Sequence, residues 1–186
     1  MDSRAQLVQY YRWLRQYGLN DAHSGNVSLR KQDKVWITPT GACADTLKIT
    51  DLITCKIGQN PTKGASLDAA LHLAVYAHNP QTRAVIHSHG AYSVAVTLNG
   101  QPFTPVDFEG QLYFPKIPVI SIDYDRYVQT APALVAEKLT QYPIAVVRGH
   151  GVYAHAKSLN LAYKWICSLE LSAKTYFIAQ QLRTIP

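Results

Sequence analysis

Apolar residues recur at helical spacing near both ends of the chain. Close to the start, Leu7, Tyr11 and Leu14 follow one another at intervals of three or four residues, which predicts a helix that ends near Gly18. Close to the end, a longer stripe at the same spacing predicts a helix over residues 159–182. Its buried face is expected to carry Leu159, Tyr163, Ile166, Leu169, Ala173 and Tyr176.

Between these two helices, short apolar runs alternate with segments of helical spacing. The short runs predict strands at residues 26–30, 35–37, 53–57, 84–87, 118–122 and 144–147. Further helices are predicted over residues 91–98 and 131–139, and after Ser66, which is expected to cap its helix. This mixture predicts a three-layer α/β/α sandwich, and the absence of a repeat or linker predicts one domain over residues 1–186.

Composition narrows the class of protein. The chain has 186 residues, of which 47% are hydrophobic and 16% are charged, as in a globular domain. It has no run of about 18 apolar residues, so no membrane segment is expected. The first residues lack the apolar core of a signal peptide. Cys43, Cys55 and Cys167 lie far apart, which disfavours disulfides and a thiolate zinc site and predicts a cytoplasmic protein.

The net charge of +6 raises the question of a nucleic-acid partner. The lysines and arginines are scattered along the chain and form no basic stripe, so we expect no nucleic-acid binding. A small anionic substrate is the partner that this charge favours.

Histidines follow two of the predicted strands. His87 and His89 stand at positions i and i+2, which project to the same side of an extended chain, and His150 follows the strand at residues 144–147. Three imidazoles would leave Zn²⁺, or another divalent metal, an open position for water or substrate. His155 is an alternative third ligand, although the glycines on both sides of His150 suit the tight backbone path of a ligand loop. His72 is better explained as a packed helix residue.

Five motifs occur together in a characteristic order. They are Ser24-Gly25-Asn26-Val27-Ser28, Ile37-Thr38-Pro39-Thr40-Gly41, Ser66-x-Asp68-x-x-x-His72-x-x-x-Tyr76, His87-x-His89 and Gly149-His150-Gly151. Over nearly its whole length the chain resembles the class II aldolase/adducin family, which contains L-fuculose-1-phosphate aldolase and L-ribulose-5-phosphate 4-epimerase. The resemblance implies an α/β/α fold with a mainly antiparallel or mixed sheet and zinc held by His87, His89 and His150. It also implies a homo-oligomer, typically a four-fold tetramer, with active sites near subunit contacts.

The resemblance also implies two candidate acid/base carboxylates. Asp68 stands where the family's aldolases carry a glutamate and its epimerases an aspartate, and like the aldolase glutamate it could ligate zinc in the resting state. Glu109 matches a glutamate that serves as acid/base in the related methylthioribulose-1-phosphate dehydratases. Two carboxylates near one metal could divide the acid and base roles.

The family's phosphate pocket matches Asn26, Thr40, Gly41 and Ser66. Their hydroxyl, amide and backbone N–H donors suit the acceptor oxygens of a phosphate. The chain departs from the sugar-phosphate aldolases at Leu67, where they place a second serine, and near Phe108, where they place a catalytic tyrosine.

The resulting hypothesis is a zinc-dependent lyase that cleaves a small hydroxy-carbonyl compound, a ketose phosphate, through a metal-stabilised enediolate. Asp68 or Glu109 would move the protons. Two alternative reactions remain open, epimerisation of a sugar phosphate, which Asp68 favours, and dehydration of a methylthioribulose-1-phosphate type of substrate, which Glu109 favours. A different class of function is that of a non-catalytic, adducin-like binding module.

Overall fold

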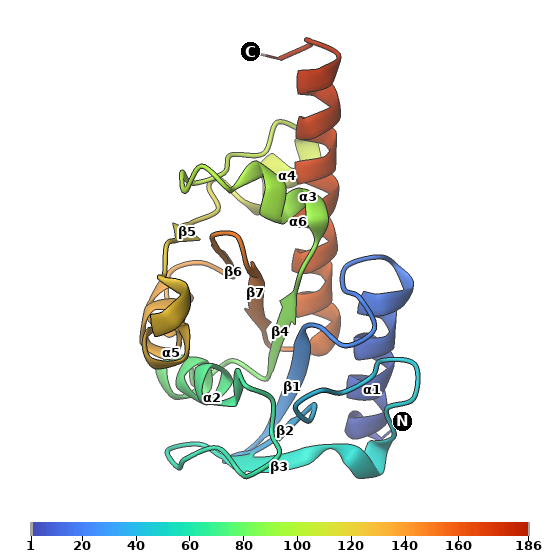
Figure 1. Cartoon of the computed structure of the whole chain (residues 1–186), viewed down its shortest axis with the longest axis vertical. Helices are drawn as coiled ribbons and strands as arrows, with labels where there is room; N and C mark the ends of the chain where they lie inside the picture. The colour runs from blue at the N-terminus through green and yellow to red at the C-terminus, as the bar shows by residue number, and fades with distance from the viewer. Residues whose placement is uncertain (1, 186) are drawn as a thin grey trace.

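A single seven-stranded sheet organises the structure, a computed structural model that describes residues 2–185 (Figure 1). Its strand order is β3-β2-β1-β4-β7-β6-β5, and every neighbouring pair is antiparallel except β5 and β6. The strands are β1 (Asn26–Lys31), β2 (Lys34–Ile37), β3 (Ile53–Lys56), β4 (Ala84–Ser88), β5 (Val119–Ile120), β6 (Ile144–Val147) and β7 (Gly151–Ala156). The mixed, mainly antiparallel sheet implied by the family resemblance is therefore confirmed.

Helices cover both faces of this sheet and complete the three-layer sandwich. They are α1 (Ser3–Gln16), α2 (Ala69–His78), α3 (Ala91–Val96), α4 (Phe108–Tyr113), α5 (Tyr127–Lys138) and α6 (Leu159–Gln181), with short 3₁₀ turns at η1 (Ile49–Asp51) and η2 (Tyr124–Arg126). Helices α1 and α6 lie on one face, and α2 and α5 lie on the other (Figure 1). Helices α3 and α4 pack against α6. None of the helices in residues 2–185 is long and apolar enough to cross a membrane.

The alternation of side chains along the strands creates two separate hydrophobic cores. In β4, Ala84 and Ile86 face α1 and α6, whereas Val85 between them faces α2 and α5. All five residues of β4 are buried, because both faces of this central strand are covered.

Several predicted boundaries are corrected by the structure. Helix α2 begins at Ala69 with Asp68 in the N-cap position, so Ser66 does not cap it; its hydroxyl instead accepts a hydrogen bond from the Asp68 backbone N–H at 3.3 Å. Helix α5 begins at Tyr127, four residues earlier than predicted. Its early residues are polar or exposed, so they carry no apolar stripe.

One strand and one α-helix were missed by the sequence analysis. Strand β7 lies between two strands and is almost fully buried, but glycine and two alanines make up half of its six residues, so it forms no apolar run of the kind that predicts the other strands. Helix α4 is only six residues long, too short for an apolar repeat, and begins where Asp107 accepts a hydrogen bond from the Gly110 backbone N–H at 2.8 Å.

Candidate metal centre and active site

The three predicted ligands converge on one point. His87 is the penultimate residue of β4, His89 follows that strand, and His150 lies in the turn between β6 and β7. Each offers a ring nitrogen, and these three nitrogens lie within 4.8 Å of one another. His155, the alternative third ligand, lies elsewhere, because its ring binds the Thr82 hydroxyl and the Tyr142 carbonyl oxygen.

The three imidazoles suit a divalent metal. His87 Nδ1 lies 3.0 Å from the carbonyl oxygen of Val152, so Nδ1 carries the proton and Nε2 keeps its lone pair. His87 Nε2 and the Nδ1 atoms of His89 and His150 are buried without a hydrogen-bond partner among the described residues. Burial lowers the pKa of each ring, to about 4 for His89, so all three are neutral at pH 7. Neutral nitrogen donors in this number fit Zn²⁺ with an open coordination position.

Asp68 lies beside this cluster, with its Oδ2 atom 3.7 Å from His87 Nε2. The carboxylate is almost fully buried and accepts three hydrogen bonds, from Asn26 Nδ2 at 2.9 Å and from the hydroxyls of Tyr127 at 2.7 Å and Tyr153 at 3.0 Å. Burial disfavours its ionised form. The neighbouring His87 ring and the hydrogen bonds from Asn26 and Tyr127 outweigh that effect and hold the pKa of Asp68 well below its usual range.

The register of the sheet explains why these residues meet. Asn26 of β1 pairs with His87 of β4, which pairs in turn with Tyr153 of β7. Residues that stand opposite one another in antiparallel strands project from the same face, so the three side chains form a row. The row faces the N-terminal ends of α2 and α5, which supply Asp68 and Tyr127.

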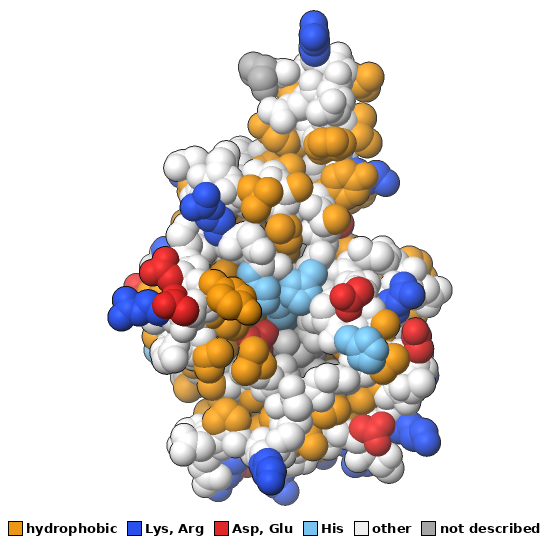
Figure 2. Space-filling view, in the orientation of Figure 1, with side chains coloured by type: hydrophobic (Ala, Val, Ile, Leu, Met, Phe, Trp, Pro, Cys, Tyr) orange, Lys and Arg blue, Asp and Glu red, His pale blue; other side chains and the backbone are white. Residues whose placement is uncertain are grey.

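A pocket of about 750 Å³ opens above the histidines. Figure 2 shows histidine side chains gathered in a hollow in the middle of this face of the molecule. All four predicted substrate-binding residues line the pocket: Asn26, Thr40, Gly41 and Ser66. Leu67, the departure from the phosphate motif, lines it as well and is 66% exposed.

Glu109, the second candidate acid/base, is placed differently. It is exposed on the short helix α4, which packs against α6, and it does not line the pocket of its own chain. His72 is likewise apart from the metal ligands. It is fully buried in α2, and its Nδ1 atom lies 2.7 Å from the Ser28 hydroxyl, as expected of a packed helix residue.

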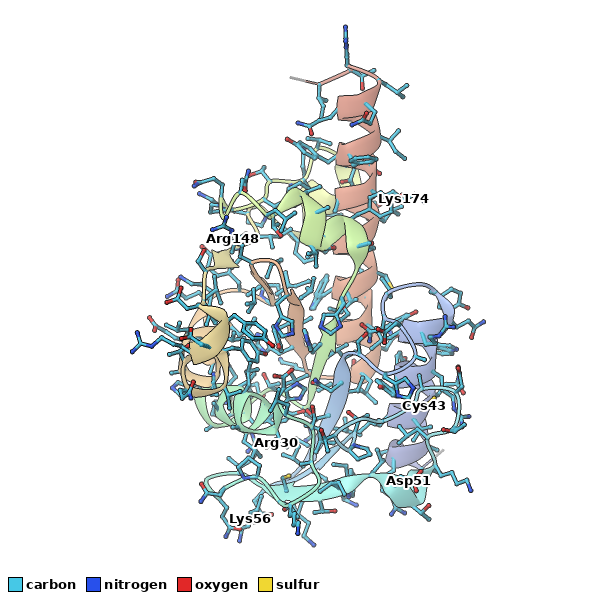
Figure 3. The ribbon with its side chains drawn as sticks, viewed as in Figure 1. Arg30, Cys43, Asp51, Lys56, Arg148 and Lys174 are labelled. Atoms are coloured by element: carbon cyan, nitrogen blue, oxygen red, sulfur yellow. The ribbon has the colours of Figure 1, made fainter. Side chains whose placement is uncertain are left out.

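Three residues of the site were missed by the sequence analysis. Tyr127 and Tyr153 contact Asp68, and burial, followed by the charge of Asp68, raises both of their pKa values, so their hydroxyls remain donors. Arg148 lines the pocket beside the end of β5, where its Nε atom donates to the Leu98 carbonyl oxygen at 2.7 Å (Figure 3). The one available signal for Tyr153 was its position three residues after His150. That position indicates a site residue only once β7 is known to pair with β4, which places Tyr153 opposite His87.

The fold and the histidine cluster define an α/β/α sandwich that carries a three-histidine group able to hold a metal ion. The sequence profile described as "Class II Aldolase and Adducin N-terminal domain" matches residues 5–177, and the chain belongs to this family.

Relatives with different activities resemble the chain to similar degrees. The crystal structure of an L-fuculose-1-phosphate aldolase from Thermus thermophilus superimposes with a TM-score of 0.90 at 28% identity, covering 98% of this chain and 96% of that one. A methylthioribulose-1-phosphate dehydratase of Gluconobacter oxydans is 31% identical over 89% of this chain and 86% of its own. A 3-oxo-tetronate 4-phosphate decarboxylase of Pectobacterium atrosepticum is 28% identical over 95% and 84%, respectively.

Proposed function

We propose that this protein is a zinc-dependent lyase that cleaves a carbon–carbon bond in a small hydroxy-carbonyl compound, a ketose phosphate. The observation that carries the proposal is the meeting of three neutral imidazoles with the Asp68 carboxylate at the floor of one pocket. The imidazoles would hold the metal, and the carboxylate would serve as the acid/base group.

A divalent metal bound here would polarise a substrate carbonyl and stabilise the enediolate that forms when the bond breaks. Asp68 supports the accompanying proton transfer, because a carboxylate that is ionised at neutral pH can accept the proton of a substrate hydroxyl. Tyr153 and Asn26 fix the orientation of that carboxylate by donating to its Oδ2 atom.

The lining of the pocket suits an anionic group. Thr40, Gly41 and Ser66 line it with hydroxyl and backbone groups, and Arg148 adds a guanidinium whose Nε atom is anchored to a backbone carbonyl. A guanidinium and neutral donors are the usual partners of phosphate and carboxylate oxygens. Asn26 is the exception in this set, because its amide already donates to Asp68 and serves the acid/base end of the site.

Epimerisation of a sugar phosphate is the second candidate reaction, favoured by one observation. The carboxylate in the site belongs to an aspartate, as the family's epimerases have at this position, and not to a glutamate. Dehydration would draw on Glu109, which does not line the pocket of its own chain.

We also propose that the protein acts as a homotetramer. The last turns of α6 project beyond the body of the molecule (Figure 1). Exposed apolar side chains lie near the end of this helix at Phe177 and Ile178, nearer its middle at Leu171, and just after it at Leu182. An exposed apolar surface of this kind is typical of a subunit contact. Light scattering of the purified protein would test this proposal, and a monomer at micromolar concentration would contradict it. The three free cysteines suit a reducing compartment, and we propose the cytoplasm.

The decisive experiment combines metal analysis with a substrate panel. We expect one zinc per chain in the purified protein, whereas a non-catalytic adducin-like module would contain none. Phosphorylated and unphosphorylated ketoses would then be incubated with the enzyme, and the products assayed for cleavage, epimerisation and loss of water. Aldehyde and ketone fragments are the expected result; an intact epimer or a dehydrated product would instead identify the other reactions.

A further inference from the structure

Two tyrosine hydroxyls and one carboxylate form a closed cluster at the edge of the metal centre. The Tyr127 hydroxyl lies 2.7 Å from Asp68 Oδ1, and the Tyr153 hydroxyl lies 3.0 Å from Asp68 Oδ2. The two hydroxyls also contact each other. With the amide of Asn26 on Oδ2, both oxygens of the carboxylate are engaged by donors of this chain.

Packing fixes the positions of both tyrosines. Tyr153 is fully buried in β7, and its ring lies parallel to that of His87 with centroids 4.0 Å apart. Tyr127 is the first residue of α5, and its ring stands at 90° to that of His150 with centroids 4.7 Å apart. Rings held by stacking, helix geometry and burial cannot follow a carboxylate that turns away, so the two hydroxyls act as fixed donors.

Fixed donors limit what the carboxylate can do. An ionised carboxylate offers about four lone-pair sites, and three donors already occupy sites on Asp68. Coordination of a metal by Oδ2 would have to compete with hydrogen bonds from Asn26 and Tyr153 to the same atom. The short side chain of aspartate gives little reach to escape this competition.

We propose that the hydroxyls of Tyr127 and Tyr153 clamp Asp68 outside the coordination sphere of the metal bound by His87, His89 and His150. The two tyrosines are positioning residues, and this inference rests on the proposed metal site. It separates this chain from an aldolase whose acid/base residue ligates zinc in the resting state. The clamp leaves about one lone-pair site of the carboxylate for proton transfer, and it leaves the open positions of the metal to substrate oxygens.

Cobalt-substituted protein tests the clamp, because the visible absorption of Co²⁺ reports its ligand number. The variants are Tyr127→Phe combined with Tyr153→Phe, Asp68→Asn, and the triple combination. Tyr11→Phe is the matched control, since Tyr11 is also buried and its hydroxyl binds only backbone carbonyls away from the cluster.

We expect wild type, Asp68→Asn and Tyr11→Phe to share one cobalt spectrum. In the double phenylalanine variant the released carboxylate joins the metal, so the absorption should change by about twofold and loss of cobalt to a chelator should slow by about tenfold. Adding Asp68→Asn to that variant should restore the wild-type spectrum. A structural effect of the phenylalanines alone would not be reversed in this way.

Two results would overturn the clamp. One is a changed cobalt spectrum in Asp68→Asn alone, because it would show that Asp68 is already a metal ligand in the wild-type protein. This result does not depend on the folding of any tyrosine variant. The other is an unchanged spectrum in the double phenylalanine variant. Either would leave the lyase proposal intact, because cobalt would still be bound. Failure of all variants and wild type to bind cobalt would overturn the clamp and the metal-dependent function together.

Discussion

The phenol ring of Tyr153 stacks on the imidazole of His87, with centroids 4.0 Å apart and ring planes only 1° from parallel. The contact joins β7 to β4, because the two residues stand opposite each other in the sheet. It places one face of a candidate metal ligand against a rigid aromatic surface, while Nδ1 of the same ring is held by the Val152 carbonyl oxygen. The orientation of His87 is therefore decided by the sheet and not by a flexible loop.

Replacing His150 by alanine should remove the metal. Two imidazoles hold Zn²⁺ far more weakly than three, so we expect less than about a tenth of the wild-type zinc after dialysis, measured by mass spectrometry of the metal. His155→Ala is the control, because that ring binds Thr82 and Tyr142 and not the cluster. Equal zinc loss from both variants would contradict the assignment of His150.

Replacing Asp68 by asparagine should keep the metal but slow the reaction. Removal of a general acid/base group lowers kcat by roughly 10²–10⁴-fold, and asparagine preserves the shape of the side chain. Steady-state kinetics on the substrate identified by the panel would measure this loss. Glu109→Gln, made in parallel, should be nearly silent, whereas the opposite pattern would assign the proton transfer to Glu109.

Acid should destabilise the metal-free protein partly through His72. Burial lowers the pKa of His72 to about 4 from a usual value of 6.5, so between these pH values the unfolded chain binds a proton that the folded chain does not. Stability is therefore lost as pH falls through this window, by about 2.5 kcal/mol for this residue at pH 4.5. Urea unfolding at pH 7 and pH 4.5 should show a drop smaller by that amount in His72→Gln. An equal drop in both proteins would refute the assignment.

A methyl group at Gly25 should disturb the site. Gly25 has φ +67°, and an added Cβ would lie 2.6 Å from the His87 carbonyl oxygen and also overlap the Asn20 amide. We expect Gly25→Ala to cost about 3 kcal/mol of unfolding free energy. Gly18→Ala shares the positive φ, at +72°, but meets no atom within 4 Å, so it should cost only about 1 kcal/mol. Similar losses in urea unfolding would contradict the clash.

Replacing Arg148 by glutamine should weaken binding of an anionic substrate. The guanidinium lines the pocket, and one charge-assisted hydrogen bond contributes roughly 1.5–3 kcal/mol, so KM should rise about tenfold or more with kcat little changed. Arg15→Gln removes the same charge from a position on α1 that does not line this pocket and should leave KM unchanged. A parallel rise in both would indicate only a long-range effect of net charge.

Much of the fold could be predicted from local pattern. The helical stripe from Leu159 to Tyr176 and the apolar runs at residues 84–87 and 144–147 correspond to α6, β4 and β6. The strand order could not be predicted, because β1 pairs with β4 across more than fifty residues of intervening chain and nothing local encodes that pairing. Strand β7 was missed for the related reason that its burial depends on neighbours that fold elsewhere.

The candidate site divides in the same way. His87 and His89 were predicted because residues two apart in an extended strand project to the same side. The motif Gly149-His150-Gly151 supplied the third predicted ligand. Tyr127 gave no such signal, and the spacing of Tyr153 from His150 could not be interpreted before β7 was placed beside β4. The two tyrosines belong to separate elements and become neighbours of Asp68 only when α5 and β7 pack around α2.

The amino-acid sequence by itself determined the kind of elements, the family and the three imidazoles, since these depend on periodicity and on residues close together in the chain. The tertiary structure alone decided which carboxylate lies beside the imidazoles and which hydroxyls hold it. That choice depends on distances between residues up to 85 positions apart, and only the pairing of strands and the packing of helices set such distances.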